Sequence, residues 1–216
     1  MAAVKDIAIY GAGGFGREVA CLINRINEVE PTWNLVGFFD DDASLKGTRN
    51  EYGEVLGDSE VLNSLEGDLA IAVSVGSPQA VKAIVGKIQK KVEYPNLFDP
   101  TAHVMDKRNF TMGIGNICTM GCSFSIAVRI GNYNTFNTNT GIGHDTVIGD
   151  FNSFMPNVNI SGGVTIGDEN FFGVKSTVLQ YLKVGNQVKI GANTLILKNA
   201  KDGNLYIGVP AKKMNL

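Results

Sequence analysis

Residues 142–154 read Ile-Gly-His-Asp-Thr-Val-Ile-Gly-Asp-Phe-Asn-Ser-Phe, and they contain two copies of the six-residue unit that decides the fold. An apolar residue recurs at every sixth position from 130 to 196. With 44% apolar residues in the chain, such a run in a chosen phase has a chance probability of roughly 5 × 10⁻⁵. The series is Ile130, Phe136, Ile142, Ile148, Phe154, Ile160, Ile166, Phe172, Val178, Val184, Ile190 and Ile196. A helix repeats near 3.6 residues and a strand near 2, so a period of six predicts short strands joined by tight corners in a parallel β-helix.

The positions between these apolar residues support this interpretation. Small, amide or branched residues lie four positions after each apolar one and can stack inside a narrow prism. They are Val128, Asn134, Thr140, Thr146, Asn152, Val158, Val164, Asn170, Ser176, Val188 and Thr194, with Leu182 as the bulky exception. In seven units a glycine directly follows the apolar residue, and we expect these glycines to adopt positive φ at the corners. Ile114, Met120 and Ile126 also keep the period, but Ile130 follows Ile126 too soon, which predicts a distorted corner between them.

The repeat units resemble those of a known family. Ile-Gly-Asn-Tyr-Asn-Thr (130–135), Ile-Gly-Asp-Phe-Asn-Ser (148–153) and Ile-Gly-Asp-Glu-Asn-Phe (166–171) are similar to the hexapeptide repeat of left-handed β-helix acyltransferases. The resemblance covers residues 101–216 and implies three units per triangular coil, with a left hand. Gly-Val-Pro-Ala-Lys (208–212) resembles the segment that closes these helices and lies along bound coenzyme A.

The first hundred residues predict a small α/β domain with a parallel sheet, which is half of a Rossmann fold. Strands are expected at 6–10, 35–39 and 69–75 with an edge strand at 94–98, and helices at 17–27 and 78–90. Gly11, Gly13 and Gly16 match G-x-G-x-x-G between the first strand and the first helix. A second mononucleotide unit is not seen, so an NAD-dependent enzyme is not expected.

The glycine loop and the acidic end of the second strand are candidate binding groups. A diphosphate can sit at the amino terminus of the first helix, where free N–H groups and the helix dipole favour anions. Asp40 or Asp41 can then accept hydrogen bonds from a ribose or base. The alternatives are a merely structural tight turn for the glycines and a solvated loop for the two acids.

The combination of the two domains resembles bacterial sugar acetyltransferases that act on nucleotide-linked amino sugars or on sialic acid. It implies a nucleotide-sugar-binding domain at 1–100 and an acyltransferase domain at 101–216. Many members carry histidine in the glycine loop where this chain has Phe15. We expect an acetyl-CoA-dependent acetyltransferase of a nucleotide-linked amino sugar. The alternatives are O-acetylation of sialic acid or another free sugar, and a non-catalytic binding scaffold.

Acyl transfer from a thioester requires a base, and the chain has two histidines. His103 lies at the transition between the domains and is expected to be structural. His144 lies two residues past an inward apolar position, so its side chain should point outward just after a corner. An imidazole can take a proton from an attacking amine or hydroxyl at neutral pH, and Asp145 can orient the ring if the backbone turns there. The family's catalytic histidine, followed by an acid, falls on these two positions. The alternative is a pair of exposed surface residues.

Period arithmetic adds Gly162, which lies one coil of 18 residues after His144 and so roughly 5 Å along the axis. Its N–H can bind the thioester oxygen and the developing oxyanion, and the resemblance gives it the same role. Asn137 matches a family asparagine near the substrate, or it is a corner residue that tolerates left-handed φ.

The expected course of coenzyme A runs in a groove between subunits toward the carboxyl terminus. It passes Gly173 and Ala192, where small residues make room, and Lys198 or Lys212 is available to its phosphates. The resemblance implies a homotrimer with active sites between subunits. Outward apolar residues such as Phe151, Met155 and Tyr181 can serve that contact.

Composition limits the partners. The net charge of −2 gives no basic surface for nucleic acid or anionic lipid. The sequence shows no leader or membrane-spanning run, so we expect a cytoplasmic protein. Cys21, Cys118 and Cys122 do not suggest a disulfide framework. Cys118 and Cys122 with His103 make a conceivable metal site, but a fourth ligand is not evident, so no metal is expected.

Overall fold

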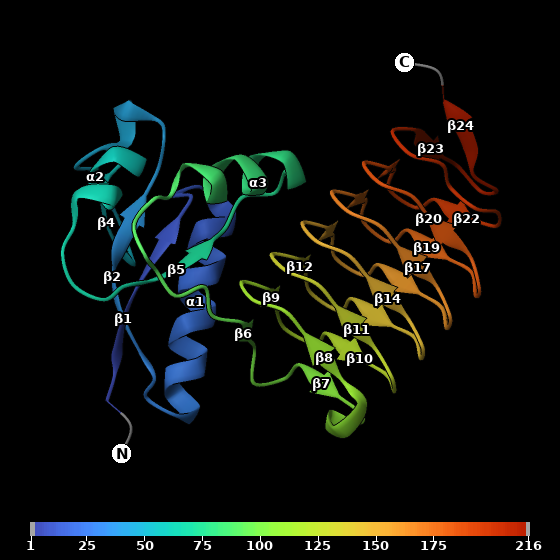
Figure 1. The fold of residues 1–216 in the computed structure, drawn as a ribbon, viewed down its shortest axis with the longest axis horizontal. Coiled ribbons are helices and arrows are strands. Elements are labelled where there is room, and N and C mark those ends of the chain that lie inside the picture. Colours follow the sequence, from blue (N-terminus) through green and yellow to red (C-terminus); the bar gives the residue numbers. More distant parts are fainter. Residues whose placement is uncertain (1–2, 215–216) are drawn as a thin grey trace. The chain divides into compact units, whose positions relative to one another are not determined.

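The computed structural model describes residues 3–214. The chain divides into two compact units, residues 1–100 and 101–216. The first contains a sheet with helices, and the second is a stack of short strands (Figure 1). No helix within the described residues is long and apolar enough to cross a membrane.

The first unit is built on a five-stranded sheet of order β3-β4-β2-β1-β5. Its strands are β1 (Lys5–Tyr10), β2 (Trp33–Phe39), β3 (Arg49–Asn50), β4 (Gly53–Gly57) and β5 (Ala70–Val73). Its helices are α1 (Gly14–Val29), η1 (Ala43–Leu45), α2 (Ser59–Ser64) and α3 (Pro78–Lys87). All pairings are parallel except that of the two-residue β3 with β4. The apolar ends of β1 and β2 are buried, as expected for a parallel sheet covered by helices.

The predicted small α/β architecture is confirmed, but two regions of the first unit differ from expectation. The polar stretch at 49–64 forms β3, β4 and α2, which the apolar patterning did not indicate. The predicted edge strand at 94–98 is wrong: β6 (Leu97–Phe98) is not part of this sheet. The chain instead bridges to β5 one residue earlier, through Glu93 beside Ala70.

The second unit is a left-handed parallel β-helix, as predicted. Its strands are β7 (His103–Val104), β8 (Thr111–Met112), β9 (Ile117–Cys118), β10 (Ser123–Phe124), β11 (Arg129–Ile130), β12 (Thr135–Phe136), β13 (Gly141–Ile142), β14 (Val147–Ile148), β15 (Ser153–Phe154), β16 (Asn159–Ile160), β17 (Thr165–Ile166), β18 (Phe171–Phe172), β19 (Thr177–Val178), β20 (Lys183–Val184), β21 (Lys189–Ile190), β22 (Leu195–Ile196), β23 (Leu205–Ile207) and β24 (Lys212–Met214). The three faces of the prism follow the orders β22-β19-β16-β13-β10-β7, β20-β17-β14-β11-β8 and β24-β23-β21-β18-β15-β12-β9.

The interior of the β-helix contains the side chains that the period predicts. The twelve apolar residues of the series are buried, and so are the small residues between them, while Leu182 is partly exposed. Three phenylalanine rings stack along one inner column, with Phe154 centred 4.8 Å from Phe136 and 4.5 Å from Phe172. A ladder of buried amides runs beside them, in which Asn152 donates through N and Nδ2 to Oδ1 of Asn134 at 2.8 and 3.0 Å. The hydrogen-bonding groups of these buried amides are therefore paired along the axis.

The predicted role of the seven glycines is wrong. None of them has positive φ; the left-handed residue comes three positions after the apolar one, as at Asp145 with φ 57° and Phe151 with φ 57°. The glycines are needed because the next coil passes too close for a side chain. A Cβ on Gly143 would lie 2.6 Å from the Gly162 nitrogen, and a Cβ on Gly173 would lie 2.6 Å from the Ala192 nitrogen.

The predicted distorted corner between Ile126 and Ile130 is also wrong. The register pairs Ile130 with Met112 and Ile142 with Phe124, so the inward period runs through 112, 118 and 124 without a break. Ile114, Met120 and Ile126 are about half exposed. The irregularity lies in the first coil, where His103 pairs with Ser123, twenty residues on, and η2 (Lys107–Asn109) takes up the extra length.

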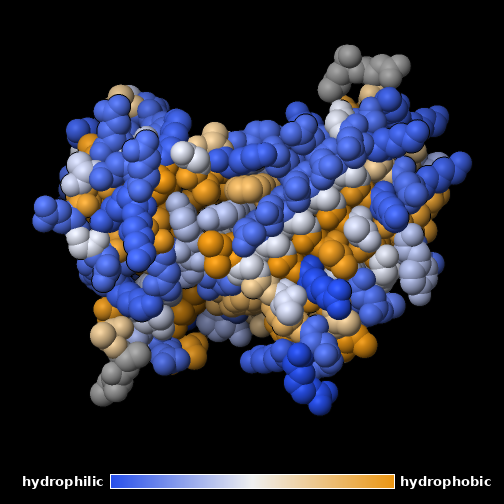
Figure 2. All heavy atoms as spheres, viewed as in Figure 1, coloured by the Kyte–Doolittle hydropathy of each residue, from blue (hydrophilic) through white to orange (hydrophobic). Residues whose placement is uncertain are grey.

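Most of the surface seen in Figure 2 is polar, with apolar groups between the polar ones. Exposed apolar side chains in the second unit include Met105 at 65% and Tyr181 at 74%. The three cysteines are free thiols, and Cys21 alone is exposed. Burial raises the pKa of the Cys118 thiol. In the described part of the chain no three His, Cys, Asp or Glu side chains gather as metal ligands.

Candidate active site

The corner between β13 and β14 carries His144 and Asp145, and the same corner one coil later, between β16 and β17, carries Gly162. The pairing of Gly141 with Asn159 sets this one-coil register. The Gly163 N–H donates to the His144 carbonyl at 2.7 Å, which ties the two corners together. The structure thus brings three of the predicted site residues to one edge of the prism.

His144 and Asp145 point the same way although they are neighbours in the chain. Asp145 has φ 57°, and this left-handed turn replaces the alternation of a strand. His144 Nδ1 lies 2.8 Å from Asp145 Oδ2, and the two side chains are 49% and 64% exposed. When Nδ1–H donates to the carboxylate, Nε2 remains as the acceptor facing solvent.

The imidazole leans toward the carboxyl end of the β-helix and lies over Gly162. A Cβ on Gly162 would overlap Nε2, Cε1 and Cδ2 of His144. The Gly162 carbonyl accepts from the Tyr181 N–H at 3.0 Å, whereas its own N–H donates to no other group of residues 3–214. A free backbone donor therefore lies beside the free nitrogen of the histidine.

Three other predicted residues lie on a different edge. Asn137 follows β12, Gly173 follows β18 and Ala192 follows β21, so all three lie at corners that lead to the face of β13, β19 and β22. Within one chain, this edge is separate from the edge that carries His144. Any site that uses both edges requires a second copy of the chain.

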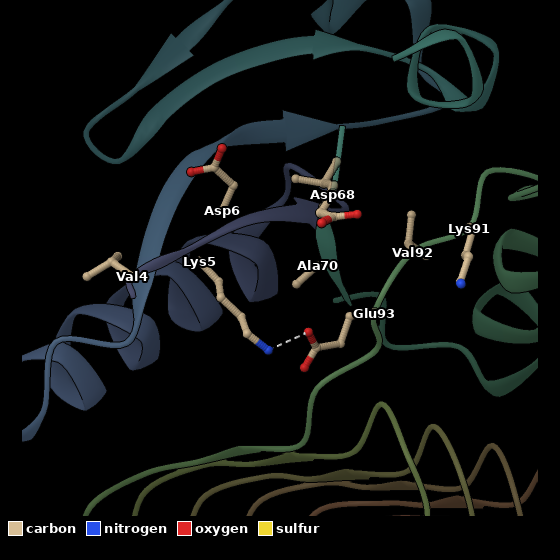
Figure 3. A pocket seen from close by; sticks show the side chains of 9 residues that line it. Val4, Lys5, Asp6, Asp68, Ala70, Lys91, Val92 and Glu93 are labelled. Carbon is tan, nitrogen blue, oxygen red and sulfur yellow. Dashed lines mark hydrogen bonds and ion pairs between the residues drawn. The ribbon is translucent and has the colours of Figure 1, made fainter. Parts of the chain in front are cut away.

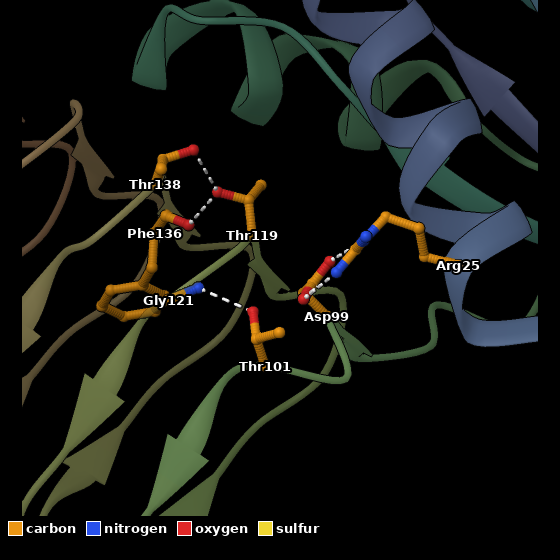
Figure 4. A network of polar contacts seen from close by, with 7 residues as sticks. All are labelled: Arg25, Asp99, Thr101, Thr119, Gly121, Phe136 and Thr138. Atoms are coloured by element: carbon orange, nitrogen blue, oxygen red, sulfur yellow. Dashed lines mark hydrogen bonds and ion pairs between the residues drawn. The ribbon is translucent and has the colours of Figure 1, made fainter. Parts of the chain in front are cut away.

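Asn137 does not occupy a left-handed corner, because that conformation falls on Asn139 with φ 58°. Its Oδ1 accepts from the Thr138 N–H at 2.8 Å. Thr119 Oγ1 lies 3.4 Å from Thr138 Oγ1 in the same group of polar contacts (Figure 4).

Positive charge gathers in the last coils. Lys198 is exposed and follows β22 on the edge that carries His144, and Lys212 is exposed on β24. Seven lysines lie beyond Gly173, at 175, 183, 189, 198, 201, 212 and 213, whereas residues 101–173 contain only one. The carboxyl-terminal coils therefore suit an anionic ligand.

In the first unit, the glycine loop joins β1 to α1. Gly11 has φ 112°, and a Cβ there would lie 2.6 Å from the Ser74 carbonyl oxygen. A Cβ on Gly16 would overlap the Gly11 carbonyl oxygen. Gly13 is different, because it faces open space and caps α1 without any side-chain hydrogen bond. Gly11 and Gly16 are thus required by close packing, whereas Gly13 leaves the helix amino terminus open to an anion.

The two acids after β2 are held by hydrogen bonds within the first unit. Asp40 Oδ2 accepts from the Ala12 N–H of the glycine loop at 2.8 Å, so this acid braces the loop. Asp41 accepts from Tyr10 Oη and from Lys87 Nζ, the latter at 2.6 Å. Burial acts to raise the pKa of Asp41, but the hydrogen bonds from Lys87 and Tyr10 hold it below its usual value. Sequence reasoning missed Lys87, which lies far along the chain on α3.

Two further features of the first unit lie away from the glycine loop. Arg25 of α1 donates through Nε and Nη2 to the buried Asp99 at 2.6 and 3.1 Å (Figure 4). A pocket of about 550 Å³ opens at the amino ends of β1 and β5, where Lys5 pairs with Glu93 at 2.8 Å (Figure 3). Because the strands are parallel, this pocket lies at the opposite edge of the sheet from the glycine loop.

Comparisons with known proteins agree with this architecture. A family model of the PglD N-terminal domain matches residues 6–88. The acetyltransferase domain of PglB from Neisseria gonorrhoeae is 27% identical, with a TM-score of 0.88 over 97% of this chain and 100% of that one. PerB from Caulobacter crescentus, in complex with CoA and GDP-perosamine, is 25% identical, with a TM-score of 0.84 over 99% of both chains. WeeI from Acinetobacter baumannii shares the fold at 22% identity, with a TM-score of 0.85 over 98% of this chain and 100% of that one. No curated protein sequence matches the chain.

A left-handed β-helix of hexapeptide units that follows a half-Rossmann domain along the chain defines an acyltransferase of the hexapeptide-repeat class. The likeness to the acetyltransferase domain of PglB and to PerB extends over nearly the whole of this chain. The fold and these matches make the chain an acyltransferase, and it resembles bacterial sugar acetyltransferases over nearly its whole length.

Proposed function

We propose that the protein N-acetylates an amino sugar carried on a nucleotide, with His144 as the general base. The observation that carries this proposal is the position of the His144 ring directly over Gly162, where Nε2 and a free N–H share one open corner. Acetyl-CoA is the acyl donor. The PglB domain also occurs in complex with acetyl coenzyme A, and PerB in complex with CoA and GDP-perosamine.

The corner supplies what a direct transfer needs. The lone pair of the neutral amine attacks the thioester carbon while the Gly162 N–H donates to the oxygen that becomes negative. His144 Nε2 takes a proton from the attacking nitrogen, and Asp145 stabilises the imidazolium through Nδ1. The carbonyl re-forms as the carbon–sulfur bond breaks, and the thiolate of coenzyme A takes the proton from His144. The products are the amide and free coenzyme A, and no acyl-enzyme is formed.

The two separate edges support a trimeric assembly. The edge with His144 and Gly162 provides the chemistry, and the edge with Gly173 and Ala192 provides the close-packed, side-chain-poor surface that a cofactor arm can approach. When the first edge of one subunit faces the second edge of its partner, the two form one composite groove. The lysines of the last coils, including Lys198 and Lys212, attract the phosphates of coenzyme A in this groove. Asn137 then lies on the partner's side of the acceptor.

The first unit is proposed to hold the nucleotide. Gly13 leaves the amino terminus of α1 uncapped, which suits a diphosphate. Asp40 holds the loop in shape through Ala12, and each carboxylate oxygen of Asp40 and Asp41 has a further lone pair for a ribose or base.

Coenzyme A release tests this function. The assay combines acetyl-CoA with a panel of UDP-, GDP- and dTDP-linked amino sugars and with free sialic acid. We expect turnover with one nucleotide-linked amino sugar and a loss of about a hundredfold or more in kcat for His144→Ala. His103→Ala is the matched control, because it removes the other exposed histidine of the same domain and should keep full activity.

Other outcomes separate the alternatives. Turnover with sialic acid in place of the nucleotide-linked sugars would replace the acceptor in the proposal with a free sugar. Equal activity in His144→Ala and wild type would reject the base. Binding of coenzyme A without turnover on any acceptor would favour a scaffold.

A further inference from the structure

Two exposed rings from different coils lie over the same dipeptide of the β-helix. The His144 ring comes from the coil before and covers Gly162, and the Tyr181 ring comes from the coil after and covers Gly163. Tyr181 lies between β19 and β20, and its side chain folds back until a Cβ on Gly163 would overlap its ring. Because consecutive Cα atoms are 3.8 Å apart, the two rings converge on one small area.

The folded-back position of Tyr181 is not explained by packing within the chain. The residue is 74% exposed, and its hydroxyl makes no hydrogen bond to any residue in 3–214. Tyr133 occupies the equivalent corner position on another edge, over Gly115, and there the ring stacks on Phe151 at 5.1 Å. Tyr181 has the same geometry, but no aromatic ring among residues 3–214 stacks on it, so one face of its ring is left for a ligand.

The path of the donor leads past this ring. The thioester must reach the Gly162 N–H, and the phosphates are drawn to the lysines of the later coils, including Lys198 on the same edge. Tyr181 stands between these two points. A flexible, largely apolar chain joins the thioester of coenzyme A to its phosphates, and a flat exposed ring is a suitable surface for such a chain.

We infer that Tyr181 binds the pantetheine arm of the acyl donor next to the thioester. The inference rests on the proposed function for the location of the thioester at Gly162. It makes Tyr181 a donor-binding residue that acts by contact of its ring, with no need for its hydroxyl in the transfer itself.

Calorimetric titration of the full chain tests this without any sugar acceptor. The two probes are coenzyme A and adenosine 3′,5′-bisphosphate, which keeps phosphates of the ligand but lacks the pantetheine arm. We expect Tyr181→Ala to weaken coenzyme A binding about tenfold, on the scale of the apolar area of one ring face, and to leave the Kd of the bisphosphate unchanged. Tyr181→Phe should bind both probes like wild type.

Tyr133→Ala is the matched control, since it removes a tyrosine of the same corner geometry on another edge, and it should not change the Kd of coenzyme A. The inference is overturned by a coenzyme A Kd within twofold of wild type in Tyr181→Ala, by an equal loss for the bisphosphate, or by a smaller assembly in light scattering. These results do not depend on His144 or on an acceptor, so they remain separate from failure of the proposed N-acetylation.

Discussion

The imidazole of His144 fills the space in which a side chain on Gly162 would stand. The two residues are one coil apart, and the parallel register of the prism places them on one corner. Glycine at 162 therefore leaves room for the His144 ring in this position, and the same absence of a side chain exposes its N–H to a ligand.

Gly162→Ala tests this relationship. The new Cβ would collide with the imidazole ring and force it out of line with the Gly162 N–H. We expect kcat to fall about 10² to 10³-fold, the scale for loss of an oxyanion donor, with little change in Tm because His144 is half exposed and can swing into solvent. The measurement is steady-state coenzyme A release.

Gly141→Ala is its control. That glycine lies on a strand, and the nearest atom to a new Cβ is Oδ1 of the exposed Asn159 at 3.2 Å, a tight contact that a small shift of this side chain relieves. It should keep wild-type kcat. A near-normal kcat in Gly162→Ala would contradict the proposal that the His144 ring and the Gly162 N–H act together in the transfer.

Asp145→Asn should lower kcat about a hundredfold. Asparagine tolerates the left-handed φ of 57° at this corner, so the backbone should be retained while the negative charge beside Nδ1 is lost. An amide also can hold the ring in the wrong tautomer by donating to Nδ1. The check is kcat together with Tm, and an unchanged kcat at an unchanged Tm would exclude Asp145 as the orienting group.

Asn152→Ala should destabilise the β-helix by about 2 to 4 kcal/mol. Asn152 is fully buried, and its Oδ1 accepts at 2.9 Å from both N and Nδ2 of Asn170, so the change leaves buried donors unpaired. Urea unfolding gives the free energy. Asn159→Ala removes an exposed amide that donates to the Asn157 carbonyl, and it should cost less than about 0.5 kcal/mol. Similar losses for both variants would argue against the buried ladder as a source of stability.

The hydrogen bonds of Asp41 predict an acid-dependent contribution to the stability of the first unit. Lys87 and Tyr10 hold the pKa of Asp41 below its usual value in the folded chain, against the effect of burial. A lowered folded pKa means that the contribution is complete above the unfolded pKa, near 3.9, and is lost as the pH falls below it. Asp41→Asn should therefore lower Tm at pH 7 and lower it less at pH 3.

Thermal unfolding of wild type and Asp41→Asn between pH 3 and 7 provides the measurement. Asp68→Asn, at an exposed carboxyl, is the control and should follow the wild-type profile. If the Tm difference between Asp41→Asn and wild type is the same at every pH, the ionisation of Asp41 beside Lys87 does not contribute to the stability of the first unit.

Local patterns were sufficient to predict much of the fold. The spacing of Phe136, Phe154 and Phe172 predicted the inner columns, because each coil repeats the same local geometry and a residue 18 positions on must land directly above. The same arithmetic placed Gly162 beside His144. The stretch at 49–64 was missed because β3 and β4 are short and polar and have no period to detect.

The sequence by itself determined the β-helix and the placement of Gly162 beside His144, since both follow from repetition along the chain, and it determined the half-Rossmann unit through the order of its apolar strands and helices. Only the tertiary structure decided why Gly143 and Gly173 must be glycines, where the left-handed corners fall, and that Asn137, Gly173 and Ala192 lie on another edge from His144. It also revealed Lys87 at Asp41 and the ring of Tyr181 over Gly163. These properties depend on how closely neighbouring coils or elements approach and which way a side chain leans, and such distances are set by atoms far apart in the sequence.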